Sequence, residues 1–218
     1  MTENSSQHKS FGTQAVAARD TGVDLTKISG EIIVGIDGSE QSYGALIWAV
    51  HEAKRRDVPV RLVTAYSLPV FTGTGFDAGY SVVDEEALRD GVAQILDEAI
   101  SRVGETDVEL RATVETGDAT GVLLELSKRA ELMVVGSRSH GGFLGRLLGT
   151  VSTSLPAHSH CPTVAVPMSY GDKIDKDRTL LNHSKTIVVG SDGSDQARVA
   201  ILKAAEEADR RGVKLTLS

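Results

Sequence analysis

A short apolar run is followed by a glycine-rich segment and then by a second run with helical character. The apolar run, Leu132 to Val135, is typical of a buried strand. Five glycines lie between residues 136 and 149, and the helical run begins at Thr150. Glycines allow the main chain to approach a phosphate, and a helix N-terminus adds partial positive charge. The segment fits neither the Walker A spacing nor a G-x-G-x-x-G that opens a helix. A loop that binds nothing is therefore the alternative.

The rest of the first 170 residues alternates short β-branched runs with amphipathic segments. Strands are predicted at 31–36, 60–65, 108–114, 132–135 and 163–166, and helices at 40–56, 88–103, 117–130 and 150–158. Pro156 lies inside the last helix and should kink or shorten it. Strands that alternate with helices form a parallel sheet with helices on both faces. The predicted fold class is α/β, a doubly wound five-stranded parallel sheet of strand order 3-2-1-4-5.

This strand order brings two distant features of the sequence to one crevice. In open α/β sheets, ligands bind past the carboxyl ends of the strands, where the strand order reverses. If the order is 3-2-1-4-5, the reversal lies between the first and fourth strands, and Asp37 and Gly136 are then expected side by side. A carboxylate can accept hydrogen bonds from a ribose, and a glycine loop can hold phosphates. We therefore predict a nucleotide site; the alternative for Asp37 is a helix cap alone.

Composition and charge narrow the class of protein. Apolar residues make up 40% of the chain and aromatic residues 4%, so the core must consist mostly of aliphatic side chains. The net charge is −7 and there is no basic tract, which disfavours binding to nucleic acid or to anionic membranes. Cys161 is the single cysteine and excludes an intrachain disulfide. Neither a signal peptide nor a membrane span is recognisable, and we expect a cytoplasmic protein.

The chain also contains an internal repeat. Residues 186–194 repeat residues 31–39 at an offset of 155 residues, and the similarity continues to Leu217, which matches Leu62. We expect a disordered arm at 1–28, a domain at 29–169, a linker at 170–184 and the truncated start of a second domain at 185–218. Residues 67–83 have no period and are predicted to form a functional or disordered loop. The short second copy is expected to be marginal alone, because so few residues cannot bury a core.

Several of these motifs resemble the universal stress protein family. The matching residues are Ile33 to Ser39 with Ser42 and Ala45, Val134 to Arg138, Gly141 to Phe143, Leu147 to Ser152, and His160 to Pro162. The resemblance extends over residues 30–168 and includes the start of the second copy. It implies an adenine nucleotide alpha hydrolase-like fold, and tandem copies are typical of the actinobacterial members of the family.

ATP-binding members of that family carry the motif G-x2-G-x9-G-[S/T]. Gly136 takes its first position and Gly149-Thr150 its last two, whereas Ser139 replaces the second glycine. The resemblance implies adenosine contacts from Gly35, Asp37 and Ala65. It implies phosphate contacts from Gly136, Ser137, Arg138, Ser139, His140, Gly141, Gly142, Gly149, Thr150 and Val151. The implied cofactor is ATP with Mg²⁺, and the implied assembly is a homodimer formed along the last strand, Thr163 to Val166.

No catalytic pattern stands out in the sequence, and no catalytic residue is predicted. His158, His160 and Cys161 could be metal ligands by type, but their spacing fits no zinc pattern and no metal site is predicted. Three hypotheses follow. The first is an ATP-binding regulatory module in a stress or dormancy response, acting on an unknown protein partner. The second is a dimerisation module that no longer binds ATP because of Ser139. The third is a slow ATPase.

Overall fold

The computed structural model describes residues 20–21, 29–67, 85–137, 150–167 and 186–218. The chain forms two compact units, Met1–Gly171 and Asp172–Ser218. The predictions for the loop at 67–83 beyond Ser67 and for the linker at 170–184 lie outside the described residues.

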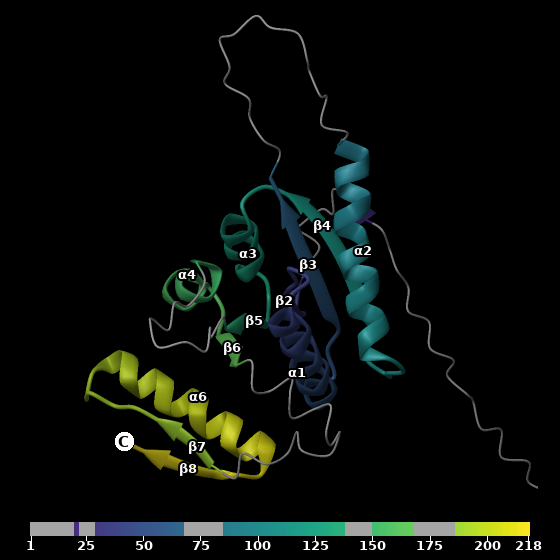
Figure 1. The fold of residues 1–218 in the computed structure, drawn as a ribbon. Helices are drawn as coiled ribbons and strands as arrows, with labels where there is room; N and C mark the ends of the chain where they lie inside the picture. Colours follow the sequence, from purple (N-terminus) through teal and green to yellow (C-terminus); the bar gives the residue numbers. More distant parts are fainter. Residues whose placement is uncertain (1–19, 22–28, 68–84, 138–149, 168–185) are drawn as a thin grey trace, which may run out of the picture. The chain divides into compact units, whose positions relative to one another are not determined.

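The first unit is built on a six-stranded parallel sheet (Figure 1). Its order is β1-β4-β3-β2-β5-β6, with β1 at Asp20–Thr21, β2 at Ile32–Gly35, β3 at Val60–Tyr66, β4 at Leu110–Thr116, β5 at Leu132–Ser137 and β6 at Thr163–Pro167. The five strands β4-β3-β2-β5-β6 confirm the predicted order 3-2-1-4-5. β1 is an addition: it pairs with β4 and lies in the segment expected to be disordered.

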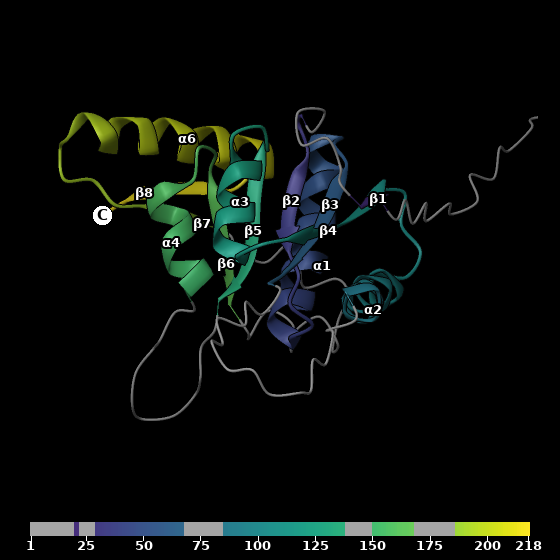
Figure 2. The same cartoon turned by 90° about the horizontal axis from the view of Figure 1, so that it is seen from above.

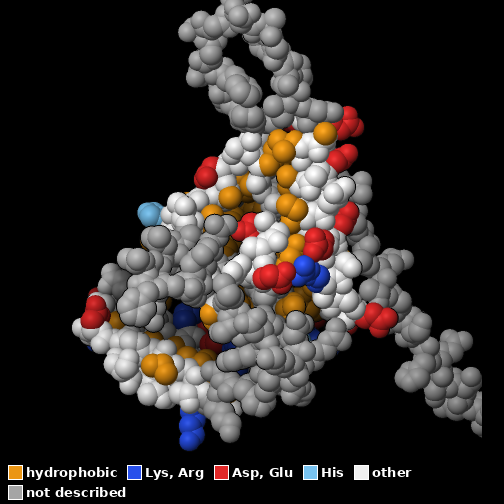
Figure 3. Space-filling model, in the orientation of Figure 1, with side chains coloured by type: hydrophobic (Ala, Val, Ile, Leu, Met, Phe, Trp, Pro, Cys, Tyr) orange, Lys and Arg blue, Asp and Glu red, His pale blue; other side chains and the backbone are white. Residues whose placement is uncertain are grey.

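Helices cover both faces of this sheet (Figure 2). Side chains alternate along each strand, so neighbouring residues enter different layers. Ile32 and Val34 of β2 pack in the layer that contains α1 (Glu40–Arg56) and α2 (Glu85–Val103). Ile33 packs in the other layer, with α3 (Ala119–Ser127) and α4 (Thr150–His158). The outward face of α2 carries acidic side chains (Figure 3), while its Leu96 and Ala99 are buried.

Two predicted boundaries, and the predicted shortening of a helix by Pro156, differ from the structure. β4 begins at Leu110 rather than at residue 108, because pairing with β3, from Val60↔Leu110 to Tyr66↔Thr116, sets its limits. α3 ends at Ser127, three residues before Ala130. α4 continues through Pro156 to His158, and Ser159 N–H donates to the Leu155 carbonyl at 2.8 Å. The proline therefore does not shorten this helix, whose Leu155 is fully buried against the sheet.

The second unit is a β-α-β element with β7 at Thr186–Val189, α6 at Asp195–Arg211 and β8 at Lys214–Leu217. β7 and β8 form a two-stranded parallel sheet. Ile187 pairs with Leu215 in the same register as Ile32 pairs with Val60 in the first unit, 155 residues earlier. The repeat detected in the sequence is thus a repeat of backbone structure. Among the described residues, no helix is long and apolar enough to cross a membrane.

A buried ion-pair cluster joins β3 and β4 to the residue before β2. Glu31 accepts hydrogen bonds from Arg61 Nε at 2.6 Å and from Arg61 Nη2 at 3.1 Å, and it also pairs with Arg111. Arg61 donates further to Thr113 Oγ1 at 2.8 Å. Glu31 and Arg61 are buried, so each charge is stabilised by the other instead of by water.

We expect Glu31→Gln to destabilise the protein by about 3 kcal/mol, because it leaves the Arg61 guanidinium buried without its counterion. Urea unfolding, followed by circular dichroism, measures this. The control is Glu109→Gln, which removes an exposed partner of Arg111 and should change stability by less than about 0.5 kcal/mol. Equal effects of the two substitutions would show that the cluster is not a structural determinant.

Candidate functional site

A cavity of about 380 Å³ lies at the carboxyl ends of β2, β3 and β5. This is where the sheet order reverses, because α1 leaves β2 toward one face and α4 leaves β5 toward the other. Segments far apart in the sequence meet here. The lining residues are Gly35, Ile36, Asp37, Ser39, Gln41, Ser42, Val63, Thr64, Ala65, Val92, Ile95, Ala119, Leu123, Val135, Gly136, Thr150, Val151 and Ser152.

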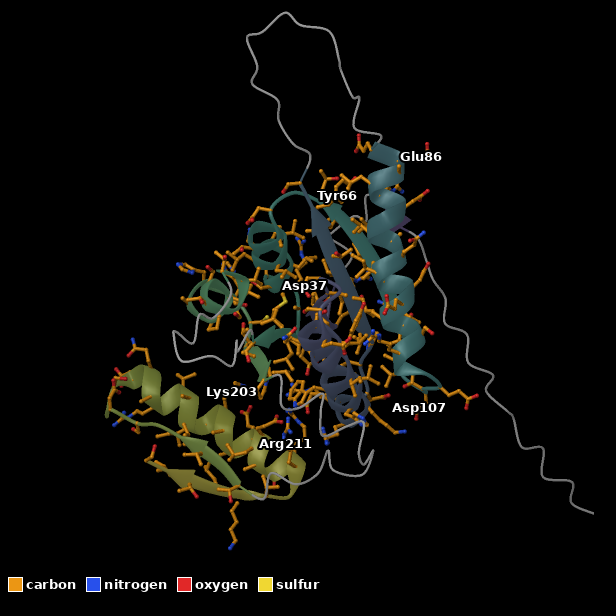
Figure 4. The ribbon with its side chains drawn as sticks, in the orientation of Figure 1. Asp37, Tyr66, Glu86, Asp107, Lys203 and Arg211 are labelled. Atoms are coloured by element: carbon orange, nitrogen blue, oxygen red, sulfur yellow. The ribbon has the colours of Figure 1, made fainter. Side chains whose placement is uncertain are left out.

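Asp37 lines the cavity from the loop between β2 and α1 (Figure 4). Its Oδ1 accepts a hydrogen bond from Ser39 N–H at 3.0 Å and another from the Ser39 hydroxyl. The N-cap of α1 is Ser39, whose side chain accepts from Ser42 N–H at 3.3 Å. The capping role therefore belongs to Ser39, and Asp37 orients the capping serine while its own side chain is exposed at the cavity.

Three helices begin at this cavity. Gln41 and Ser42 belong to the first turn of α1, Ala119 begins α3, and Thr150 begins α4. A helix N-terminus carries N–H groups without intrahelical acceptors and a partial positive charge. Among the described residues, no Lys or Arg lines the cavity, so the helix N-termini are the positively polarised groups that these residues supply. Such a site suits an anionic group, and especially a phosphate.

The other walls of the cavity are apolar and are formed by side chains of the sheet and of two helices. Val92 and Ile95 of α2 form part of the wall, together with Val63 and Ala65 of β3 and Leu123 of α3. Ile95 also lies against the turn before α1, because a Cβ atom placed on Gly38 would be 3.4 Å from Ile95 Cγ2. The cavity therefore combines an apolar wall, suited to a flat ring, with polar helix ends suited to an anion.

Gly136 occupies the closest approach of β5 to α1. A Cβ atom placed on Gly136 would lie 2.6 Å from both the carbonyl carbon and the carbonyl oxygen of Gln41. The obstructing atoms are backbone, so they cannot move aside as a flexible side chain would. Gly136 was predicted as a phosphate contact; it lines the cavity and is also required for the packing of β5 against the first turn of α1.

The predicted site residues fall into three groups. Six of them line the cavity: Gly35, Asp37, Ala65, Gly136, Thr150 and Val151. Ser137 ends β5 and is not among the lining residues. Arg138, Ser139, His140, Gly141, Gly142 and Gly149 lie outside the described residues. The sequence analysis did not include several lining residues, among them Ser39, Gln41 and Ser42. A serine directly before a helical run is a signal for a helix N-terminus and could have identified them. Val92 and Ile95 carry no such signal, because they look like any apolar helix positions.

The segment around Cys161 is occupied by structural contacts. His160 N–H donates to Ser127 Oγ at 3.0 Å, and burial raises the pKa of the Cys161 thiol. A raised thiol pKa means less of the reactive thiolate. The described part of the chain contains no group of three or more His, Cys, Asp or Glu side chains that could hold a metal ion.

Glu115 is a half-buried acid on β4, paired with Ala65 of the cavity wall. Its Oε1 atom is buried and accepts no hydrogen bond from the described residues. Burial raises the pKa of this carboxyl, and the nearby charge of Arg61 opposes that shift. The proton is thus held more tightly in the folded chain than in the unfolded chain.

The fold is that of an α/β protein with a cavity at the reversal of its sheet. Residues 30–167 match the family model described as the Universal stress protein family, and the chain belongs to that family. Universal stress protein Rv2623 of Mycobacterium tuberculosis is 34% identical over 190 residues, covering 84% of this chain and 61% of that protein. Rv1996 of the same species is 32% identical over 198 residues, covering 84% of this chain. The chain thus spans about three fifths of the length of these relatives.

Solved structures agree on the fold. A universal stress protein of Archaeoglobus fulgidus matches with a TM-score of 0.58 and 19% identity, covering 87% of this chain and 65% of that one. The UspA protein of Lactobacillus plantarum matches with a TM-score of 0.50 and 16% identity, covering 64% of this chain and 98% of that one. A universal stress protein solved in complex with cAMP is 28% identical, covering 65% of this chain and 98% of that one, and its TM-score of 0.45 is too low to transfer the ligand position.

We expect Gly136→Ala to destabilise the protein by about 1–3 kcal/mol, because the new methyl group overlaps the backbone of Gln41. Gly91→Ala is the matched control. Gly91 lies in α2 with nothing within 4 Å of its added Cβ, so alanine should stabilise the helix by about 0.5–1 kcal/mol. Chemical denaturation of the three proteins measures both effects. A neutral Gly136→Ala substitution would contradict the close approach.

The raised pKa of Glu115 predicts a pH-dependent effect on stability. A carboxyl that binds its proton more tightly when folded makes stability fall as the pH rises through its folded pKa. Glu115→Gln should therefore be more stable than the wild type at pH 8, and this advantage should shrink toward about pH 4, where the wild-type carboxyl becomes neutral. Thermal unfolding across this range tests it, with the exposed Glu105→Gln as control. An advantage that grows toward acidic pH would refute the assignment.

Proposed function

We propose that this chain is an ATP-binding universal stress protein that acts as a nucleotide-sensing regulatory module in a stress or dormancy response. The observation that carries the proposal is the composition of one cavity. Asp37, Gly136 and Thr150 line the same hollow although about 100 residues separate the first from the other two. A carboxylate, a glycine that lets two chain segments approach closely, and a helix N-terminus are the groups expected around a nucleotide.

The cavity suggests how the nucleotide would lie. The base would pack against the apolar wall that includes Ala65 and Ile95, where a flat ring can exclude water. Ribose hydroxyls would donate to the Asp37 carboxylate, which Ser39 already holds in position. The phosphates would then extend toward the starts of α1 and α4.

The segment between β5 and α4 supports phosphate binding at this end. Gly136 near its start and Thr150 at its end both line the cavity, so the segment leaves and returns at the site. It carries Arg138, His140 and Gly149, for which the family resemblance implies phosphate contacts. Asp37 is the single carboxylate among the described lining residues. Mg²⁺ would therefore be bound mainly by the phosphates and by water, as it commonly is in nucleotide sites.

We propose binding without appreciable turnover. The described lining residues include no histidine or glutamate, and the Asp37 carboxylate is engaged with the capping serine. Positioning and charge stabilisation alone permit slow hydrolysis at most. The signal would instead be structural, because a ligand that bridges β2, β3, β5 and α4 stabilises their mutual arrangement.

We propose further that the signal passes through contacts between copies of the chain. β6 ends the sheet, and among the described residues no strand pairs with its outer edge. An edge strand offers backbone groups to a partner, so Thr163–Val166 is the proposed homodimer interface. Native mass spectrometry of the purified protein would report the number of subunits together with any retained nucleotide.

Isothermal titration calorimetry with ATP and Mg²⁺ tests the proposed site. Asp37→Asn keeps the oxygen that accepts from Ser39 but removes the charge that receives the ribose hydroxyls, so affinity should fall roughly tenfold. Asp192→Asn is the matched control. Asp192 occupies the equivalent position of the second unit and makes the same contact, to Ser194 N–H at 2.9 Å, so its substitution should leave affinity unchanged. No heat with the wild type, or equal affinity for all three proteins, would refute the proposal.

A further inference from the structure

Helix α2 forms one wall of the cavity but buries few of its own side chains. Of its 19 residues, Leu96 and Ala99 are the buried ones. Both follow Val92 and Ile95, the two residues of this helix that line the cavity. The helix begins on the side of the sheet where β3 and β4 end (Figure 1). The cavity wall is therefore held mainly by the residues that come after it in α2.

Arg102, near the end of α2, joins this helix to the start of α1. Its guanidinium carbon lies 4.0 Å from the centre of the Tyr43 ring, and Tyr43 is buried. Its Nη1 donates to Glu40 Oε1 at 2.7 Å, and its Nη2 donates to Glu98 Oε1 at 2.8 Å. A planar guanidinium can stack on a ring while its edge donates to carboxylates. Arg102 therefore anchors α2 both to a buried ring and to the first residue of α1.

The contacts of Arg102 extend to the turn that carries Asp37. Glu40 is the first residue of α1, and the serine before it donates to the Asp37 carboxylate. Ile95 lies against the same turn, through the approach to Gly38 described above. Ile95 and Arg102 are seven residues apart in one helix, so they lie on the same face, two turns from each other. This face of α2 therefore contacts the Asp37 turn at one point and the start of α1 at the other.

Loss of the Arg102 contacts would leave α2 folded but its cavity wall less firmly held. The side chains of Arg102 and Glu40 are 41% and 74% exposed, and such ion pairs add little to global stability. Leu96 and Ala99 would still bury the second half of the helix. Gly91, which lies just before the wall residues, weakens the helix there. The Arg102 contacts therefore affect the position of the wall more than the folding of the chain.

We propose that Arg102 is a positioning residue of the nucleotide site. By anchoring α2 to the start of α1, it holds the wall of Val92 and Ile95 at the distance from Asp37 that a base and its ribose require. The inference rests on the proposed function, because it concerns the nucleoside part of the same cavity. The phosphates would lie at the starts of α1 and α4, away from this wall. Binding of the base in turn orders the first half of α2, so that the surface of this helix reports the occupancy of the site.

Three probes distinguish positioning by Arg102 from a simple effect of its charge. ATP with Mg²⁺ is titrated by calorimetry into the wild type and Arg102→Met, and adenosine and inorganic tripolyphosphate are measured by displacement of ATP. We expect the substitution to weaken ATP and adenosine by the same factor, about fivefold, and tripolyphosphate by less than about twofold. Weaker binding of ATP and tripolyphosphate with adenosine unchanged would overturn the proposal, because Arg102 would then act only through its charge.

The other variants separate the ring, the guanidinium and the net charge. Tyr43→Leu removes the ring without changing charge and should give the same pattern as Arg102→Met. Arg102→Lys keeps a cation for Glu40 but not the planar stack, so it should lose less affinity than Arg102→Met. Arg198→Met is the matched control: it removes the same charge from an exposed position of α6 and should bind all three probes like the wild type. Equal losses in Arg198→Met and Arg102→Met would contradict the proposal.

Hydrogen exchange without ligand tests the anchor independently of nucleotide binding. In Arg102→Met, we expect the amides of residues 89–95 to exchange faster, while β2 and β5 keep the protection of the wild type. Unchanged exchange in α2 would refute the anchor even if ATP binds, and a general loss of protection would show that Arg102 supports the fold and not the site. Absence of ATP binding by the wild type would refute the proposed function, whereas faster exchange confined to α2 would still establish the anchor.

Discussion

The approach of β5 to the first turn of α1 is the contact on which the site depends. Gly136 meets the backbone of Gln41 at a distance that excludes any side chain. This contact fixes the end of β5 beside the end of β2, and so brings the Gly136 segment next to Asp37. The constraint is steric and acts whether or not a ligand is bound. The fold therefore requires a glycine at this position whether or not the protein binds a ligand.

Electrostatics of the cavity follow from the same arrangement. In a parallel sheet every strand ends at the same edge, and the following helix begins there with its N-terminus toward the site. α1, α3 and α4 all begin at the cavity, so partial positive charges converge without a basic side chain among the described lining residues. The protein thus carries a net charge of −7 and still offers a polar pocket suited to an anion. The apolar wall from α2 supplies the complementary surface for a ring.

The two copies within the chain act as controls for each other. They share register, capping turn and the αL residue that ends the helix, which is Asp57 in the first copy and Gly212 in the second. They differ in burial: Ile33 is inaccessible to solvent, whereas Val188 is largely exposed. The two copies therefore share their local structure, and in the first copy the apolar face is buried by strands and helices that follow it in the sequence. This is the behaviour expected of a fold whose core is completed by segments distant in sequence.

The sequence by itself determined the alternation of strands and helices, because periodicity acts within each segment. With the strand order 3-2-1-4-5 assumed, it also predicted that Asp37 and Gly136 meet. The tertiary structure decided the rest. It assigned the cap to Ser39, carried α4 through Pro156, placed Val92 and Ile95 in the cavity wall and made Gly136 a packing residue. Each of these depends on which side chains meet across the fold, and no periodicity within one segment encodes that.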